Sequence, residues 1–427
     1  MDFFEKKLLI LGANPETAGF VQKANEMGIF TIVTDYDPYA YAKQFASKPI
    51  NIDAMDVDAL YEFAIEEKVD AVMVGVAELL LVPYQKLCER LGFPYYAEAD
   101  IFELMTDKMS FKNFCRKYDV PVVEEFYVDI NDESTYSNVK LPVVVKPVDS
   151  CSSKGISVCK TMTELKEGIE KALTFSQSKR ILIEKYMTGD EVVLYYTFQD
   201  GEPILTAMCD RYTNKEQEGV AQLPTSYVFP SRYLKKYMNE TDEKTKNMFR
   251  NLGVKHGITF IQSFVDGDGG VRFYEPGYRL NGAQEHYIVN AMTGIDGREL
   301  MLNFAFTGKM ADEDLAKKAN PMFHKWGCML SPLVKTGKIG KIDGLEKIAE
   351  MTEVVSINPN YRVGDTVKGL GTLKQVVCRF YIVTDTKQEL KSVIDKIHEN
   401  FIVEDENGES MFLTFFNTEI LNERYTD

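Results

Sequence analysis

Leu141-Pro-Val-Val-Val-Lys-Pro147 is a run of β-branched residues followed by a lysine, and Asp149-Ser-Cys-Ser-Ser-Lys-Gly155 follows after Val148. A second run, Ile156-Ser-Val-Cys159, comes next, so the stretch predicts two strands joined by a loop of small residues. Backbone N–H groups in such a loop can close over phosphates, and Lys146 places a fixed positive charge beside them. Taken alone, the stretch is equally compatible with an ordinary serine-rich hairpin.

The segment Arg180-Ile-Leu-Ile-Glu-Lys-Tyr-Met187 predicts a further strand. It delivers Glu184 and the backbone of Tyr186 and Met187 to one place, and Glu191 follows after a short turn. Backbone groups suit the edge of an adenine ring, and a carboxylate can accept hydrogen bonds from ribose hydroxyls. The segment therefore predicts a nucleotide-binding turn.

Two more segments supply charge. Gly270-Val-Arg-Phe-Tyr-Glu-Pro-Gly-Tyr-Arg279 predicts a strand that carries Glu275, and such a carboxylate suits Mg²⁺ because hard cations take oxygen ligands. Arg279 can hold a phosphoryl group or a carboxylate through paired hydrogen bonds. Thr106-Asp-Lys108 precedes an amphipathic helix predicted from about Ser110 to Tyr118, and alone it is typical of a solvated helix start.

The first hundred residues alternate strand and helix patterns. Lys7-Leu-Leu-Ile-Leu-Gly12 is an apolar run that stops at a glycine, as a buried parallel strand does, and the last strand of the series is predicted at Phe93–Tyr95. This rhythm predicts a parallel sheet. Asp35 stands where a ribose-binding acid would, but Gly12-Ala-Asn-Pro-Glu-Thr17 lacks the second and third glycines of the dinucleotide fingerprint. We therefore expect a Rossmann-like scaffold without a dinucleotide, which disfavours an NAD-dependent enzyme.

Composition bounds the class of protein. Of 427 residues, 45% are hydrophobic and 27% are charged, which is the balance of a soluble globular chain. A net charge of -16 argues against a nucleic-acid partner, although a local basic cluster can still hold an anionic substrate. No apolar run approaches the roughly 20 residues that span a bilayer, and Met1–Lys7 shows no signal-peptide pattern. Seven scattered cysteines indicate reduced thiols, so we expect a cytoplasmic protein with no membrane partner.

The order and spacing of these segments resemble the ATP-grasp superfamily, as seen in biotin carboxylase, glycinamide ribonucleotide synthetase and the amino-acid (dipeptide) ligases. The resemblance covers nearly the whole chain, and it implies ATP and Mg²⁺ as cofactors. The residues that it assigns to the nucleotide are Lys108 and Lys146 on the phosphates, Ser152, Ser153, Lys154 and Gly155 in a mobile covering loop, Glu184, Lys185, Tyr186 and Met187 in the adenine hinge, and Glu191 on the ribose.

The same resemblance assigns the chemistry. It makes Glu275 a metal ligand and Arg279 the arginine that steadies the transferred phosphate. Glu285-His286 stands before Thr293-Gly-Ile-Asp296 at a spacing that an active-site Glu-His pair of biotin carboxylase shares. Glu285 and His286 are therefore expected to be catalytic together with Arg279.

The chain departs from the metal pattern of this family, which is a glutamate on the preceding strand followed by Glu-x-Asn. Ser263 stands at the first position, beside Gln262, and Gly277 stands at the asparagine position. Three explanations stay open. Asn281, Glu285 or Gln262 completes a shifted site; or substrate and ATP oxygens supply most of the coordination; or the chain binds nucleotide without catalysing transfer.

The predicted fold class is α/β and α+β, with three domains. They are a pre-ATP-grasp Rossmann-like domain at 1–97, an ATP-grasp domain at 98–310 with a mobile lid subdomain at about 120–187, and a C-terminal closing domain at 311–427. The last domain shows helical apolar spacing over 390–401 and a strand over 376–383, and it adds no recognisable chemistry.

The expected activity is an ADP-forming ligation that activates a carboxylate as an acyl phosphate and joins it to an amine. Small-molecule carboxylates and amines are the expected partners, and the resemblance implies a homodimer. Arg211 lies near the substrate mouth in this family, where it either binds a carboxylate or is a solvated surface arginine. The alternatives are a non-catalytic or regulatory ATP-binding protein with a degenerate metal site, and a biotin-type carboxylase that needs a separate carrier chain.

Overall fold

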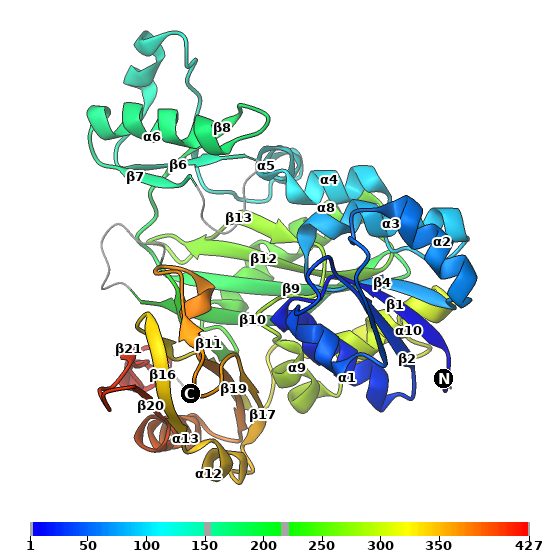
Figure 1. Ribbon diagram of the computed structural model, residues 1–427. Coiled ribbons are helices and arrows are strands. Elements are labelled where there is room, and N and C mark those ends of the chain that lie inside the picture. Colours follow the sequence, from blue (N-terminus) through cyan, green and yellow to red (C-terminus); the bar gives the residue numbers. More distant parts are fainter. Residues whose placement is uncertain (1–2, 149–154, 215–221, 426–427) are drawn as a thin grey trace.

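The structure is a computed structural model, and it describes residues 3–148, 155–214 and 222–425. A parallel α/β unit, a large central sheet and a smaller sheet unit that projects from it form the main parts, and a further α/β unit follows along the chain (Figure 1). Among the described residues, no helix has the length and apolar character that crossing a bilayer requires.

The chain begins with a parallel sheet in the order β3-β2-β1-β4. Its strands are β1 (Lys7–Leu11), β2 (Phe30–Thr34), β3 (Lys48–Ile50) and β4 (Ala71–Val74). All of β4 is buried, and so is β1 after its first residue, because both faces of this sheet are covered. Its helices are α1 (Ala18–Glu26), α2 (Val57–Glu67) and α3 (Leu81–Leu91).

The predicted parallel sheet is confirmed, but the predicted strand at Phe93–Tyr95 is wrong. The fourth strand is β3, which lies at the edge of the sheet, where Pro49 costs no ladder hydrogen bond. Pro94 sits in the middle of the segment that was expected to pair. The apolar residues of that segment instead precede α4 (Ala99–Thr106) and α5 (Lys108–Lys117).

An antiparallel sheet of eight strands forms the centre, in the order β13-β12-β9-β10-β11-β14-β19-β17 (Figure 1). Its strands are β9 (Glu191–Gln199), β10 (Glu202–Thr213), β11 (Pro224–Phe229), β12 (Gly257–Val265), β13 (Val271–Gly277), β14 (Trp326–Leu330), β17 (Val354–Pro359) and β19 (Cys378–Thr384). The register aligns Glu191, Arg211, Tyr227, Met329 and Tyr381 in one row across the sheet. The sheet continues across residue 310, so the domain boundary proposed there stays a prediction.

The projecting unit has its own small core. Its sheet runs β5-β8-β6-β7, made of β5 (Glu125–Phe126), β6 (Val143–Pro147), β7 (Ser157–Cys159) and β8 (Ile181–Lys185). Helix α6 (Met162–Phe175) begins with a capping box between Thr161 and Glu164. Leu165 and Ile169 of α6 pack against Val143 of β6 in a cluster separate from the main core. We call this unit the lid sheet, and a separate core is what a unit that moves as one body requires.

The remaining elements are helices and the strands of two small sheets, β15-β21 and β18-β16-β20. The helices after the lid sheet are α7 (Leu234–Glu240), α8 (Asp242–Leu252), α9 (His286–Thr293), α10 (Gly297–Thr307) and α11 (Leu315–Lys318). The last hundred residues add β15 (Leu333–Val334), β16 (Gly337–Asp343), β18 (Thr366–Val367), β20 (Ile402–Asp405), β21 (Phe412–Thr414), α12 (Leu345–Ala349), α13 (Lys387–Asn400) and α14 (Glu419–Arg424). The strand predicted at 376–383 and the helix predicted at 390–401 correspond to β19 and α13, with small differences at the ends.

Aromatic residues join the N-terminal parallel α/β unit, which we call the first unit, to the central sheet. The rings of Tyr96 and Tyr278 meet edge to face at 5.1 Å, and Phe102 and Phe198 complete the group around Tyr278. The Tyr278 hydroxyl donates to the backbone carbonyl of His256 and lies 3.2 Å from that of Tyr96. This cluster holds the two units in a fixed relation.

We expect Tyr278→Ala to lower the free energy of unfolding by about 3–5 kcal/mol, because it leaves a cavity where both units meet. Urea unfolding followed by circular dichroism measures the change. Tyr127→Ala is the matched control, because Tyr127 is 83% exposed. Equal unfolding midpoints for the two variants would contradict the role of this cluster.

Candidate active site

Glu184 lies at the centre of a buried charge cluster between the lid sheet and α5. Its carboxylate pairs with Lys146 of β6, Nζ to Oε2, at 2.5 Å and with Lys112 of α5. Burial acts to raise the pKa of Glu184, but the two lysine charges outweigh burial and hold the pKa below its usual range. The carboxylate therefore stays charged and orients Lys146. Lys112 was missed from the sequence, although its position one helical turn after Lys108 is a usable signal.

Helix α5 also carries Lys108 to the central sheet. Nζ of Lys108 lies 3.0 Å from Oε1 of Glu275 on β13. Nζ of Lys146 lies 5.7 Å from the centre of the Tyr274 ring, the residue before Glu275. The structure thus brings the two predicted phosphate lysines and the predicted metal glutamate together between the two sheets.

The turn that was predicted to hold the nucleotide begins directly after Glu184, at the end of β8. The backbone N–H of Lys185 donates to Glu124 and that of Tyr186 donates to Pro142, so these groups fix the path of the chain toward Met187. Gly155 has φ +76°, and a Cβ there would meet Phe175 and Pro147 at 2.8 Å, so the end of the loop requires glycine. The predicted loop residues Ser152, Ser153 and Lys154 lie outside the described residues.

Glu191 and Arg211 form an ion pair across β9 and β10. Their side chains are only 11% and 14% exposed, and Nε of Arg211 donates to the Tyr227 hydroxyl at 3.3 Å. Arg211 is therefore not a solvated surface arginine. The predicted ribose carboxylate has a cation beside it and lies in the row of residues that crosses the central sheet.

Arg279 connects the central sheet to the first unit. Its guanidinium lies over the Phe260 ring at 5.1 Å and 3.6 Å from Oε2 of Glu78. Glu78 opens the 3₁₀ helix η3 (Glu78–Leu80) that follows β4. Burial raises the pKa of Glu78, Arg279 opposes this shift and the nearby Glu275 adds to it. Glu78 was missed, although an acid just beyond the carboxyl end of a parallel strand is a common place for a ligand-binding residue.

The missing metal asparagine has a steric explanation. Gly277 pairs with Phe260 across β12 and β13, and a Cβ on Gly277 would lie 2.2 Å from the Phe260 ring. No side chain fits at Gly277 while Phe260 supports Arg279.

Few of the described residues are suited to bind a metal ion. The described residues hold no group of three or more acidic, histidine or cysteine side chains that could hold a metal ion. Gln262 pairs with Glu275 in the register, so their side chains share a face, and the Gln262 carbonyl accepts from the Tyr274 hydroxyl at 2.7 Å. Ser263 pairs with Phe273 and is fully buried, so it is no candidate. Glu275 with Gln262 fits Mg²⁺ that brings nucleotide phosphates and water as its other ligands.

Glu285 and His286 are both buried at the start of α9. Among the described residues, no hydrogen-bond partner reaches Oε2 of Glu285 or either ring nitrogen of His286. Burial raises the pKa of Glu285 to about 8 and lowers the pKa of His286 to about 3. At neutral pH the carboxyl is therefore mostly protonated and the imidazole is neutral. The shifted pKa of Glu285 matches a proton-transfer group better than that of His286 does.

A further buried arginine lies where the first unit meets β19 of the central sheet. Arg379 of β19 is 5% exposed, and Nη2 lies 3.5 Å from Oε1 of Glu16. Within the described ranges, its guanidinium makes no hydrogen bond. Gln284 links the first unit to β19 beside Arg379. Its side-chain amide donates to the backbone carbonyl of Glu16 at 2.8 Å and accepts from the Tyr381 hydroxyl at 2.9 Å. A buried guanidinium with unused donors is suited to bind an anion. No sequence motif marks Arg379 or Glu16.

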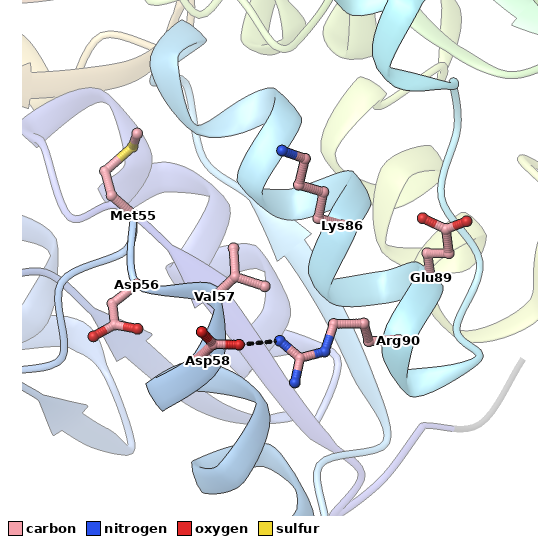
Figure 2. Close-up of a pocket in the computed structure, with 7 residues that line it drawn as sticks. All are labelled: Met55, Asp56, Val57, Asp58, Lys86, Glu89 and Arg90. Carbon is pink, nitrogen blue, oxygen red and sulfur yellow. Dashed lines mark hydrogen bonds and ion pairs between the residues drawn. The ribbon is translucent and has the colours of Figure 1, made fainter.

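An open pocket of about 480 Å³ lies elsewhere, between α2 and α3 of the first unit (Figure 2). Asp58 and Arg90 form an ion pair across it, and Lys86 and Glu89 line its other side. None of the predicted site residues lines this pocket. It is therefore not the candidate active site.

The lid sheet, the central sheet and the lysines between them define a clamp for a nucleoside triphosphate. Comparisons with known proteins agree. A family model described as the ATP-grasp domain matches residues 139–283. D-alanine–D-alanine ligase of Haemophilus influenzae is 32% identical over 242 residues, which cover 55% of this chain and 76% of that protein. The chain therefore belongs to the ATP-grasp superfamily, as its motifs predicted, and it is an ATP-dependent ligase by class.

Two other similarities extend this result. A formate-dependent phosphoribosylglycinamide formyltransferase of Haloquadratum walsbyi is 26% identical over 274 residues, 63% of this chain. The chain spans about two thirds of the length of that relative (66%). The crystal structure of an L-amino acid ligase from Bacillus licheniformis has a TM-score of 0.76 at 18% identity, and the match covers 94% of this chain and 99% of that one. The fold of that structure thus extends over nearly the whole chain.

We expect Gly277→Asn to destabilise the protein by about 1–3 kcal/mol, because the new side chain must displace the Phe260 ring. Thermal unfolding of Gly277→Asn, Phe260→Ala and the double variant measures the coupling between the two sites. In the double variant, the loss should be smaller than the sum of the two single losses. Additive losses would show that the two positions do not compete for the same space.

Glu285→Gln should change how stability depends on pH. The folded protein raises the pKa of this carboxyl from 4.5 to about 8, so it binds the proton more tightly than the unfolded chain does. Its contribution is fully present below pH 4.5 and is lost as pH rises toward 8. The wild-type Tm should therefore fall more steeply over this range than that of Glu285→Gln. The exposed Glu346→Gln serves as control, and parallel pH profiles for all three proteins would refute the raised pKa.

Proposed function

We propose that this chain is an ADP-forming carboxylate–amine ligase that binds ATP between the lid sheet and the central sheet. The observation that carries the proposal is the convergence of Lys108 and Lys146 with Glu275 between these sheets. Two lysines from separate elements suit a chain of phosphates, because each neutralises charge without proton transfer. Glu191 would accept from the ribose, and the backbone at Tyr186 and Met187 would meet the adenine edge.

Mg²⁺ would be held by Glu275, Gln262 and the nucleotide, and when bound it would neutralise negative charge on the phosphates. Lys108 already pairs with Glu275, so this lysine can move to a phosphate oxygen when the nucleotide enters. Lys146 is held in place by Glu184, which keeps its charge directed toward the space beside Tyr274. These residues orient the nucleotide and offset its charge.

The reaction has two steps. An oxygen of the substrate carboxylate attacks the γ-phosphorus, a P–O bond forms, and the bond to the β–γ bridging oxygen breaks so that ADP leaves. The amine nitrogen then attacks the acyl carbon, the C–O bond to phosphate breaks, and inorganic phosphate leaves. Arg279 would steady the transferred phosphoryl group, since its guanidinium is fixed between Phe260 and Glu78. Alignment and charge stabilisation are the main tasks of the protein in such transfers.

Glu285 is a better candidate than His286 for the general base that accepts the proton from the amine. Its raised pKa lies closer to neutral pH than that of an ordinary carboxyl, so the deprotonated form is a stronger base. His286 stays neutral, and its ring lies 4.7 Å from the Tyr287 ring at a tilt of 44°, which favours a packing role.

The substrates would lie between the three parts of the chain. Arg379 has unused donors for a carboxylate, and Glu16 and Glu78 can hold an ammonium group. We therefore favour small molecules that carry both a carboxylate and an amine. The proposal has three further parts. The protein would be a cytoplasmic homodimer, its domains would meet at about residues 97 and 310, and residues 120–187 would move as a lid.

A second candidate function is nucleotide binding without transfer. The exchange of the metal asparagine for Gly277, with Phe260 filling its place, favours it. The two functions differ in one observable, because only the ligase forms ADP in a substrate-dependent way.

The test is an ADP and phosphate assay with ATP and Mg²⁺ against pools of amino acids and other small carboxylates. We expect substrate-dependent ADP, and we expect Glu275→Gln to lower kcat by about 10²-fold or more, as loss of a group that stabilises developing charge does. Glu346→Gln controls for the loss of one surface charge. AMP and pyrophosphate as products would refute the acyl-phosphate route. Saturable ATP binding without turnover would favour the second candidate function.

A further inference from the structure

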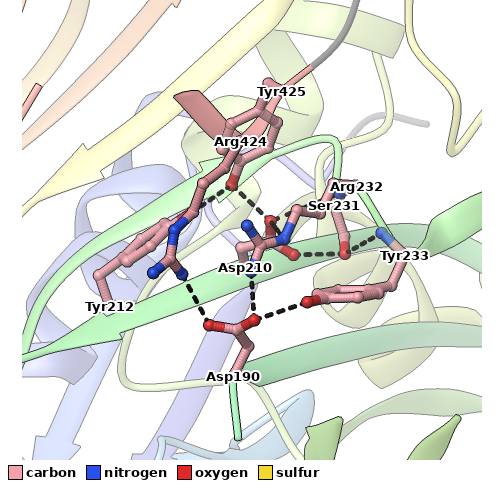
Figure 3. A network of polar contacts seen from close by, with 8 residues as sticks. All are labelled: Asp190, Asp210, Tyr212, Ser231, Arg232, Tyr233, Arg424 and Tyr425. Atoms are coloured by element: carbon pink, nitrogen blue, oxygen red, sulfur yellow. Dashed lines mark hydrogen bonds and ion pairs between the residues drawn. The ribbon is translucent and has the colours of Figure 1, made fainter. Parts of the chain in front are cut away.

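Two acidic residues flank the Glu191–Arg211 pair in the fold. Asp190 precedes Glu191 at the start of β9, and Asp210 precedes Arg211 on β10. Figure 3 shows both carboxylates in one network with Arg232 between them and with Arg424 and Tyr425 reaching in from the end of α14. Sequence motifs assign no role to this network.

Asp190 is held from three sides. Oδ1 accepts from Nη1 of Arg424 at 2.9 Å, and Oδ2 accepts from the Tyr233 hydroxyl at 2.6 Å and from Arg232. Burial acts to raise the pKa of Asp190, but the Tyr233 hydrogen bond and the two guanidinium charges outweigh burial and lower it. Asp190 is therefore a charged anchor immediately before the predicted ribose carboxylate.

Asp210 is held by the residue that follows Arg424. Oδ2 accepts from the Tyr425 hydroxyl at 2.5 Å, and Oδ1 accepts from the Ser231 hydroxyl at 2.5 Å. Asp210 is only 2% exposed, so water cannot hydrogen-bond to its carboxyl group. The two hydroxyl donors supply the hydrogen bonds that this buried group needs. The Nε of Arg232 lies 3.6 Å from Asp210 and thus links the two carboxylates.

Tyr425 is itself fixed in the core of the last unit. Its ring meets Trp326 edge to face at 5.6 Å, and its backbone carbonyl accepts from Nζ of Lys387 at 2.6 Å. The pair Arg424–Tyr425 therefore connects that core with the start of β9 (Figure 3).

The start of β9 has little freedom once this network forms. The Val265 N–H donates to the Asp190 carbonyl at 2.8 Å. A Cβ on Gly189 would lie 2.0 Å from the Val265 carbonyl, so the backbones approach as closely as only glycine allows. Strand β12 holds the backbone of Asp190, and Arg424 holds its side chain. Together they constrain the orientation of the adjacent Glu191.

We propose that Arg424 and Tyr425 are positioning residues for nucleotide binding, which act through Asp190 and Asp210 on the Glu191–Arg211 pair. This inference rests on the proposed function, because it takes Glu191 as the ribose carboxylate. It adds that docking of the last unit sets the affinity of the clamp for ATP, although neither residue touches the nucleotide.

The experiment measures ATP affinity by calorimetry with Mg²⁺, which needs no knowledge of the other substrates. Arg424→Gln removes the ion pair to Asp190, and we expect ATP to bind about two- to fivefold more weakly, the range for a partly exposed pair. Tyr425→Phe keeps the ring against Trp326 and removes only the hydroxyl from Asp210, and it should weaken ATP in the same direction. Arg424→Lys should restore part of the affinity, because it keeps the charge.

Arg250→Gln is the matched control. Arg250 pairs with Glu202 at 2.7 Å and its side chain is 36% exposed, close to the 44% of Arg424, but it lies on α8 away from this network. Its loss should leave ATP affinity unchanged. Wild-type affinity in Arg424→Gln and Tyr425→Phe, with or without a lower Tm, would overturn the inference and leave a purely structural contact. Failure of the unmodified protein to bind ATP would instead overturn the proposed function, and this inference with it.

Discussion

The ion pairs of Glu184 with Lys146 and Lys112 hold the lid sheet and α5 in one electrostatic unit. A carboxylate buried this deeply needs its cations, because removal of one partner from a buried pair costs about 3–5 kcal/mol. Lys108 lies one turn earlier on the same helix and reaches Glu275 of the central sheet. Helix α5 is therefore the rigid link between the two sheets that enclose the candidate nucleotide site.

Side-chain packing explains why Gly277 stands where the metal pattern of the family has an asparagine. Gly277 is an empty position because Phe260 occupies the space above it, and the same ring supports Arg279. An asparagine and this aromatic platform cannot coexist at the site. The absence of the asparagine side chain and the support of Arg279 thus both follow from the pairing of Phe260 with Gly277 on neighbouring strands.

Charged residues from distant segments meet in pairs between the first unit and the central sheet. Glu16 and Glu78 follow strands of the parallel sheet, Arg279 follows β13, and Arg379 lies on β19. Arg279 pairs with Glu78 and Arg379 lies beside Glu16, so each cation of the candidate substrate region faces a carboxylate of the first unit. The network around Asp190 and Asp210 extends the same arrangement to the end of α14.

The sequence by itself determined the class of fold and pointed to most residues of the candidate nucleotide site. Short apolar runs that end at glycine specify parallel strands. The order of Lys108, Lys146, Glu184, Glu191 and Glu275 along the chain can be recognised without a structure. It also exposed the anomaly at Gly277, but it could not explain it, because the reason is a ring on another strand. The strand expected at Phe93–Tyr95 failed for a related reason, since an edge position tolerated Pro49 in β3 and the apolar pattern could not distinguish the two segments.

Tertiary structure alone decided which charges pair and which are buried. Lys112 and Glu78 carry only a positional signal, and Glu16 and Arg379 carry no motif. The contacts of all four join residues far apart in sequence. Burial, and not residue type, gives Glu285 its raised pKa and leaves Arg379 with unused donors. A sequence pattern records the elements that a chain forms, whereas desolvation and long-range pairing depend on how those elements pack.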